Sequence, residues 1–564
     1  MDITLSRGHR PNSTIRSSNG CWTCRLRRKK CDENRPEKPE WMDGGVRQEE
    51  MGERLKREVK ENAHLRREFR AVHISNDLPE TTAPGSLDDL EPRPDPSIVR
   101  LQRGTDCTFL RKDGRNSVPF GRPCTVLITF YLENLFPFLF PFYSPSPLEG
   151  GRSWILEMMI SSPVVKQATL CQSSYFFALS QENANHHAIW EMVLAQTQDA
   201  FGILRQSLQV INSSSIKEHL HGAVRIMASI MQIQRFVVTI LCFDNCQTHL
   251  NAGLALFKQI LESINAVESE GIVSCFNAVV NHLGPSTRIE YAQDIYIQSA
   301  EQAAFRFSSA LLIFDDIIAS TVLQDQPKLY DYYRCLLSDI NGTGPLINLE
   351  AVVGCQNWVL LHICEISALD GWKKQCKGAG NLDVIELVRR ATAIKGPLEA
   401  HLIRLESEPL ASAQGGSSLL DSFNINNHQQ SKLPVSQSRL ATRVWAHAAL
   451  LYLTIVVSGW QPASVEVRYH VGRVIDLLTH EISPAALLRT MVWSFCVAGR
   501  LAEPEQEAHF RRMVLTLQPP TVFGTIRKAL EIMENVWKDR DTSNSASRDL
   551  ATCFKSQGDL VLLV

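Results

Sequence analysis

The run Val444–Val457 reads Val-Trp-Ala-His-Ala-Ala-Leu-Leu-Tyr-Leu-Thr-Ile-Val-Val and is the most apolar stretch of the 564-residue chain. It is shorter than the roughly 20 apolar residues that a membrane-spanning helix needs, and it carries His447. We therefore expect this run to form a central core helix of a folded domain.

Helical periodicity continues on both sides of that run. Between Ile189 and Ile211, apolar residues recur at intervals of three and four, which is typical of an amphipathic helix, whereas the alternation of a strand is scarce along the chain. Residues 123–540 are therefore expected to form an all-α domain. The expected helices cover residues 153–180, 184–211, 215–243, 247–266, 287–321, 350–372, 382–405, 439–458, 465–479, 484–498, 503–517 and 521–537.

Polar and proline-rich segments precede this domain. Residues 46–70 are charged helix formers, but a strict heptad would put Glu58 and Asn62 on the seam, so a dimerising coiled coil and a single solvated helix both stay open. The remaining segments are a disordered arm (1–19), a flexible linker (71–122), an internal loop (411–436) and a tail (541–564).

Composition indicates an ordinary soluble protein, with 44% hydrophobic and 21% charged residues. Although the chain's net charge is only −2, residues 1–38 carry ten Lys and Arg against four Asp and Glu. A basic N-terminal segment followed by a mildly acidic remainder is typical of a protein that binds DNA through the first and other proteins through the second. Residues 1–20 lack the apolar core of a secretory signal, so we expect the 15 cysteines to be reduced in the cytosol or nucleus.

The basic N-terminal segment contains the stretch Gly20–Cys31, Gly-Cys-Trp-Thr-Cys-Arg-Leu-Arg-Arg-Lys-Lys-Cys, with the spacing C-x2-C-x6-C. A C-x2-C pair can bring two sulfurs to one tetrahedral zinc, and adjacent cations favour nucleic-acid phosphate. A redox pair and a plain nuclear-import signal are the alternatives, but neither accounts for the third cysteine. The candidate zinc ligands are Cys21, Cys24 and Cys31. The candidate DNA contacts are Arg25, Arg27, Arg28, Lys29 and Lys30.

This stretch resembles the first half of the fungal zinc binuclear cluster transcription factors, which reads C-x2-C-R-x-R-[RK]-x-K-C. In that family six cysteines share two zinc ions and a short helix enters the major groove. The resemblance implies that Arg27 and Arg28 read base edges, where arginine's planar fork suits guanine. It places Arg25, Lys29 and Lys30, together with Arg28, mainly on phosphates.

The second half of such a cluster is missing. After Glu37 the sequence passes directly to Lys38–Gly45, which resembles the linker that follows a complete cluster, and the next cysteine is Cys107. Residues 20–45 therefore form a truncated zinc-cluster module with its linker. A wrong exon boundary and a real deletion both account for the gap between Glu37 and Lys38.

The helical body resembles the fungal-specific transcription factor domain over roughly residues 124–540. The segments that carry this likeness are 244–251, 354–358, 369–372, 442–460 and 484–537. The resemblance implies an all-helical regulatory region that holds partners and a small effector.

No enzyme motif stands out: the sequence has no P-loop, no GxGxxG after a strand, no HExxH and no nucleophile elbow. Paired histidines and cysteines (His186 with His187, His219 with His221, Cys242 with Cys246) are expected on the surface or in the core rather than on a metal. Five tryptophans are also expected in the core: Trp358, Trp372, Trp445, Trp460 and Trp493. The alternative is that they line an effector pocket.

Together these observations predict a nuclear, zinc-dependent, sequence-specific transcription factor that regulates RNA polymerase II transcription and is not an enzyme. Its expected cofactor is zinc, and its expected partners are double-stranded DNA and transcriptional co-regulators, without a membrane; a homodimer stays open. The rival hypothesis is a regulator that does not bind DNA, because the truncated cluster cannot fold.

Overall fold

The computed structural model describes residues 121–146, 150–180, 199–200, 202–206, 216–241, 243, 246–264, 271–285, 287–288, 296–339, 342, 344–408, 435–540 and 561–564. These residues all belong to one compact unit, Gly114–Val564. The predicted zinc module, the charged helix 46–70 and most of the predicted helix 184–211 lie outside the described residues.

Helices dominate the described residues, so the all-α prediction is confirmed for them. Up to residue 350 the elements are α3 (Arg122–Phe130), the π-helical turn η1 (Tyr131–Leu135), α4 (Phe136–Leu139), α5 (Ser153–Ser161), α6 (Pro163–Leu179), α8 (Leu220–Thr239), α9 (Cys246–Ser263), α10 (Ile272–His282), β1 (Thr287–Arg288), β2 (Tyr296–Ile297), α11 (Ala300–Leu323) and α12 (Tyr330–Leu337). From residue 350 they are α13 (Glu350–Val353), α14 (Asn357–Gly378), α15 (Val384–Ser407), α17 (Val435–Ser458), α18 (Val465–Asp476), η4 (Leu477–Glu481), η5 (Ala485–Met491), α19 (Val492–Arg500), α20 (Pro504–Leu515), η6 (Pro520–Phe523) and α21 (Gly524–Lys538).

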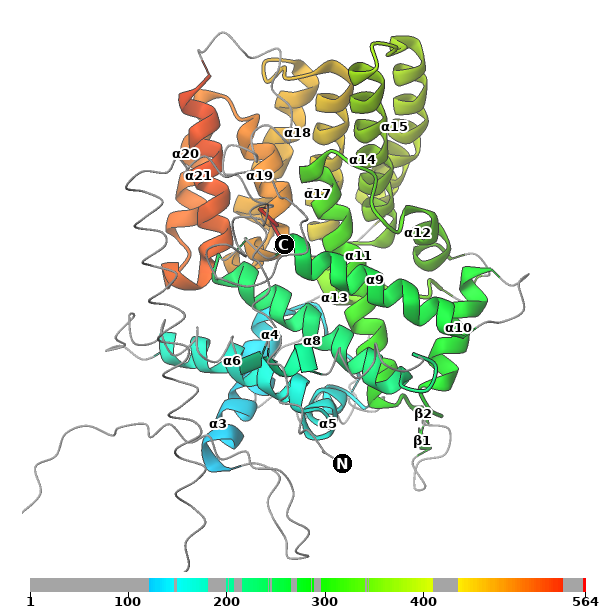
Figure 1. The fold of residues 1–564 in the computed structure, drawn as a ribbon. Helices are drawn as coiled ribbons and strands as arrows, with labels where there is room; N and C mark the ends of the chain where they lie inside the picture. Colours follow the sequence, from blue (N-terminus) through cyan, green and yellow to red (C-terminus); the bar gives the residue numbers. More distant parts are fainter. Residues whose placement is uncertain are drawn as a thin grey trace, which may run out of the picture. The chain divides into compact units, whose positions relative to one another are not determined.

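Helix α17 contains the apolar run Val444–Val457. It packs against α14, α15, α18 and α19, and Figure 1 shows these helices side by side. By length and composition α17 could cross a membrane, but 78% of its apolar window is buried inside the protein. The prediction of a core helix is therefore confirmed. Trp445 of α17 stacks on Trp493 of α19, with ring centroids 5.4 Å apart and planes 6° from parallel.

We call the elements before residue 350 the first half of the domain and those from residue 350 onward the second half. Helix α11 is the core helix of the first half, where it packs against α5, α8 and α9, and it also contacts α14 of the second half. A capping box defines its start: the Gln302 N–H donates to Ser299 Oγ (3.2 Å), and the Ser299 N–H donates to Gln302 Oε1 (3.0 Å). The predicted helix 287–321 is therefore wrong in its first part. There β1 and β2, the only strands among the described residues, pair antiparallel instead.

Other boundaries differ for local reasons. The predicted helix 153–180 is two helices, because the Ser162 side chain caps α6 and Pro163 occupies its first turn. The predicted helix 484–498 begins as the 3-10 turn η5. Helices α10 and α12 were not predicted; they are short, at 11 and 8 residues.

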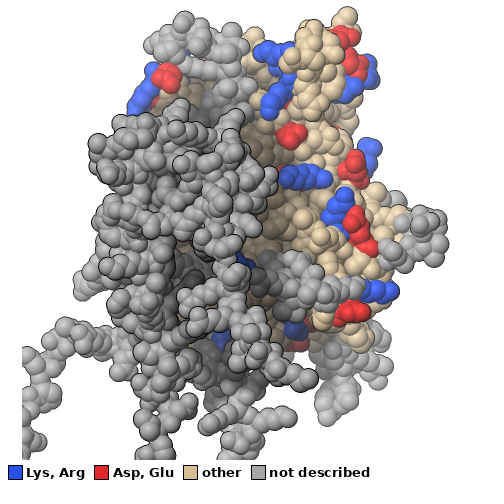
Figure 2. All heavy atoms as spheres, viewed as in Figure 1, with Lys and Arg blue, Asp and Glu red and all other residues tan. Residues whose placement is uncertain are grey.

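On the face shown in Figure 2, the basic and acidic side chains of the described residues are interspersed, and neither sign of charge gathers in one place. Many of them pair with each other. Glu386 bonds Arg389 and Arg390, each at 2.7 Å, and Lys395 bonds Glu466 at 2.8 Å. The described residues visible on this face therefore form no basic patch of the kind expected at a nucleic-acid interface.

Candidate functional site

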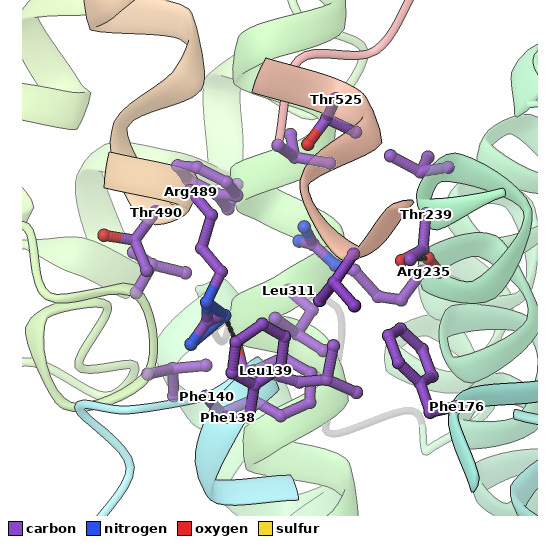
Figure 3. Close-up of a pocket in the computed structure, with 16 residues that line it drawn as sticks. Phe138, Leu139, Phe140, Phe176, Arg235, Thr239, Leu311, Arg489, Thr490 and Thr525 are labelled. Atoms are coloured by element: carbon purple, nitrogen blue, oxygen red, sulfur yellow. Dashed lines mark hydrogen bonds between the residues drawn. The ribbon is translucent and has the colours of Figure 1, made fainter. Parts of the chain in front are cut away.

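A cavity of about 90 Å³ lies where helices from both halves of the domain meet. Most of its wall is apolar. The lining comes from α4 and the residue after it (Phe138, Leu139, Phe140), α6 (Phe176), α8 (Arg235, Val238, Thr239), α11 (Leu311, Phe314), α13 (Val352, Val353), η5 (Arg489, Thr490), η6 (Val522), α21 (Thr525) and Val564. Figure 3 shows two arginines, Arg235 and Arg489, entering this apolar space from different elements.

Arg489 extends from η5 into the cavity (Figure 3). Its neighbours Leu487, Leu488 and Met491 are buried in the core, which fixes the turn and leaves Arg489 on the cavity side. The guanidinium carbon lies 3.9 Å from the centroid of the Phe138 ring, a cation–π contact. Nη1 donates a long hydrogen bond (3.4 Å) to the Leu139 carbonyl, and this is the dashed line in Figure 3.

No carboxylate among the described residues forms an ion pair with Arg489. Its Nε atom is inaccessible to solvent and has no hydrogen-bond partner there. Burial, which no nearby negative charge offsets, lowers the pKa of Arg489 to about 9. The cavity thus contains a cation whose charge the described residues do not balance.

Arg235, in contrast, has a charged partner. Its Nη2 lies 2.5 Å from Oδ1 of Asp315, a residue of α11 that is fully buried. Burial raises the pKa of Asp315 to about 6, although the Arg235 charge opposes that shift. Burial also lowers the pKa of Arg235. The two arginines therefore differ: one is neutralised by a buried carboxylate, and the other is not.

The other polar side chains of the cavity wall are those of three threonines. Thr239 Oγ1 donates to the Arg235 carbonyl (2.7 Å) and Thr490 Oγ1 donates to the Leu487 carbonyl (2.8 Å), so two of the three threonine hydroxyl protons are used within their own helical turns. The cavity wall contains no cysteine, serine or histidine. The arrangement is suited to binding an anion rather than to nucleophilic or acid–base chemistry.

A larger groove of about 710 Å³ runs beside α12 and α14. Trp358 lines it and stacks on His401, with ring centroids 5.0 Å apart. His362 Nδ1 lies 3.0 Å from Glu365 Oε2. These two pairs of the groove are thus already engaged with each other, and we regard the groove as a weaker candidate than the cavity.

The structure places few of the predicted site residues. All eight predicted zinc and DNA contacts lie outside the described residues, as do His186, His187 and Cys242. His219 and His221 are exposed and Cys246 is buried in the core, as predicted. Among the described residues, no group of three or more His, Cys, Asp or Glu is placed to hold a metal ion.

Neither Arg489 nor Arg235 was predicted from the sequence as a site residue. The available signal was an isolated arginine between apolar residues, as in Leu487–Trp493 (Leu-Leu-Arg-Thr-Met-Val-Trp). A charge on the buried face of an apolar helical turn needs a partner. Of the five tryptophans considered as pocket-lining residues, Trp445 and Trp493 are fully buried in the core, and none lines the cavity.

Comparison with known proteins places these observations in a family. Residues 126–564 match the fungal-specific transcription factor domain. Transcription factor dibT of Pestalotiopsis microspora is 32% identical, covering 97% of this chain and 99% of the relative. Pestheic acid cluster transcriptional regulator 3 of Pestalotiopsis fici is 26% identical, covering 94% and 96%. The ustiloxin B cluster transcription factor ustR of Aspergillus flavus is 24% identical, covering 93% and 95%.

The alignment with dibT runs over 626 positions, more than the 564 residues of this chain. That relative therefore contains residues that have no counterpart here. No solved structure matches the chain.

Proposed function

Because the chain belongs to the fungal-specific transcription factor domain family, we propose that it is a nuclear, zinc-dependent regulator that binds specific DNA sequences and controls transcription by RNA polymerase II. The observation that carries the proposal is the end-to-end likeness to a named transcription factor, over 97% of this chain. A match of that extent reaches into the N-terminal region that contains C-x2-C-x6-C. Transcription regulation is the part of this assignment that the relatives' names support directly.

In this proposal the small basic module binds DNA, and the helical domain regulates the activity of that module. Cys21, Cys24 and Cys31 hold zinc, while Arg27 and Arg28 contact base edges. Phosphates are held by Arg25, Lys29 and Lys30, and also by Arg28. The mixed charge on the described face in Figure 2 supports assigning DNA contact to the module rather than to that face.

The names of several relatives suggest which genes are controlled. They refer to a pestheic acid cluster, to trichothecene biosynthesis and to a ustiloxin B cluster. We extend this to the present chain and propose that its targets are the genes of one biosynthetic cluster. Deleting the gene should lower or raise the transcripts of neighbouring biosynthetic genes together, as measured by RNA sequencing.

The second candidate is a regulator that does not bind DNA, and the missing half of the zinc cluster favours it. A tetrahedral zinc takes four ligands, and the two-zinc cluster of the resembled family uses six cysteines. The chain offers three thiols close together. It would then hold at most one zinc, weakly, because an open fourth position suits a catalytic rather than a structural zinc.

Metal content and DNA affinity of the full chain separate the two candidates. If the second candidate is right, the sequence as it stands should bind at most one zinc by mass spectrometry and show little specific DNA affinity. Inserting a C-x2-C…C segment between Glu37 and Lys38 should restore two zincs and specific binding, whereas the same insertion with serines should not. Cys124→Ser, which changes a half-buried cysteine of the helical domain, is the matched control. Two tightly held zincs in the unaltered chain would refute the truncation argument.

The base readers can be tested in the restored chain. Arg28→Ala should cost on the order of 1–3 kcal/mol and relax base preference, because a bidentate guanine contact is lost. Lys29→Ala should weaken all sequences about equally and flatten the salt dependence. A uniform loss of affinity in both variants would show that Arg28 does not read bases.

A further inference from the structure

The cavity in Figure 3 has an unusual charge balance. Two guanidinium groups face an apolar wall, and only Arg235 meets a carboxylate, that of Asp315. Arg489 contacts an aromatic ring and one backbone carbonyl instead. Arg489 is half-buried, and taking part of a guanidinium out of water is costly unless an anion and hydrogen-bond acceptors replace the lost hydration. Among the described residues no carboxylate forms an ion pair with Arg489.

We propose that the cavity binds a small organic anion, a monocarboxylate with a short aliphatic body, whose carboxylate pairs with the Arg489 guanidinium. The planar fork of arginine matches a carboxylate with two parallel hydrogen bonds. The Nε of Arg489 is inaccessible to solvent, so the ligand's carboxylate would meet the guanidinium through its Nη atoms.

The size and lining of the cavity select this class of ligand. A volume of about 90 Å³ is smaller than the engineered cavity of about 150 Å³ that admits benzene, so only a compact body fits. Phe138, Phe176, Leu311 and Val353 offer it apolar contacts. An inorganic phosphate is a poor fit, because most of its oxygens would face hydrocarbon. A dicarboxylate is also disfavoured, because only one cation here lacks a partner.

The position of the cavity implies that its ligand acts on the fold. The walls come from α4, α8 and α11 in the first half of the domain and from η5 and α21 in the second. A ligand on Arg489 would therefore contact both halves and stabilise their packing, as any ligand of the folded state does. This proposal goes beyond DNA binding and is tested without it.

Binding can be measured on the purified full chain with isobutyrate as the probe. Isobutyramide is the neutral isostere, and inorganic phosphate tests for a general anion site. Calorimetry should detect saturable binding of isobutyrate, which should also raise the melting temperature by a few degrees at saturation. Isobutyramide and phosphate should bind at least tenfold more weakly. Equal binding of phosphate, or no isobutyrate binding, would overturn the proposal.

Three variants identify the site. Arg489→Met should reduce isobutyrate binding at least tenfold, and Val522→Phe should do the same by filling the cavity while keeping the charge. Arg512→Met, which changes an exposed arginine that contacts only His509 in the described structure, should leave binding unchanged. Undiminished binding by both site variants would place isobutyrate elsewhere.

Stability without ligand gives an independent readout. If Arg489 lacks an anionic partner in the protein, Arg489→Met should match or exceed the wild type in melting temperature. A clear fall in melting temperature, together with no isobutyrate binding by the wild type, would mean that a carboxylate of the chain itself already occupies Arg489. That result would refute the ligand site without bearing on DNA binding.

Discussion

Replacing Gly354 by alanine tests the packing between α13 and the turn that follows α4. Gly354 ends α13 in the left-handed conformation, with φ +78°. A Cβ atom at this position would lie 2.2 Å from two ring carbons of Phe142 and 2.5 Å from a third. Both the backbone and the neighbouring ring therefore oppose any side chain here.

The expected cost is the sum of two effects. A non-glycine residue in the left-handed region loses roughly 1–2 kcal/mol, and overpacking that forces a ring to move loses roughly 1–3 kcal/mol. Gly354→Ala should therefore lower the free energy of unfolding by about 2–5 kcal/mol. The measurement is a urea titration of the full chain, in which the midpoint falls while the slope is unchanged.

Two other glycines separate these effects. Gly380 has φ +69° but open space around its Cβ position, so Gly380→Ala should show only the backbone cost. Gly472 lies inside α18, at ordinary φ and with nothing within 4 Å of the added Cβ, so Gly472→Ala should stabilise by about 0.5–1 kcal/mol.

The clash itself can be isolated by a double-mutant cycle. Combining Gly354→Ala with Phe142→Ala should cost less than the sum of the two single changes, because the second removes the ring that the first would strike. Additive costs, or a Gly354→Ala variant no less stable than Gly380→Ala, would refute the reasoning.

Asn357→Ala should lower the free energy of unfolding by about 2–4 kcal/mol in a urea titration, because its amide makes three hydrogen bonds of 2.7–2.8 Å to backbone groups; a loss below 1 kcal/mol would contradict this. Arg235→Leu should cost about 3–5 kcal/mol by leaving buried Asp315 alone, and adding Asp315→Leu should recover at least half of it; a double variant as unstable as Arg235→Leu would refute the pairing argument. His470 has its pKa lowered to about 4, mainly by burial, so its contribution to stability is complete above pH 6.5 and is lost as the pH falls through about 4. The loss amounts to about 3 kcal/mol, so His470→Asn should flatten the stability profile between pH 6.5 and 4, and an unchanged slope would argue against it.

The sequence predicted the helical architecture where the signal is local. The apolar run Val444–Val457 identified α17 because no exposed helix could tolerate such a surface. The same approach located α15, although its Pro397 lies inside the helix. It failed at residues 287–299, where the Ser299 capping box decides where α11 begins, and it missed α10 and α12, whose periodic patterns are short.

The cavity could not be predicted because it is not a local feature. Its wall combines residues from Phe138 to Val564 that meet only in the folded domain. The composition of η5 shows an arginine among apolar neighbours, but not whether a carboxylate pairs with it. The zinc and DNA contacts, in contrast, are a local feature, because they are predicted from the spacing of residues within a stretch of twelve. They stay predictions because they lie outside the described structure.

The burial of α17 also has a consequence for biosynthesis. Its apolar surface is covered partly by α18 and α19, which end at Asp476 and Arg500 and so leave the ribosome later. Because a chain is synthesised at about 5–20 residues per second, α18 and α19 become available to cover α17 only a few seconds after α17 itself has been made. During that interval it has the length and composition of a membrane segment. A chain that terminates prematurely between Ser458 and Arg500 should therefore be captured by chaperones or aggregate rather than persist as a shorter regulator.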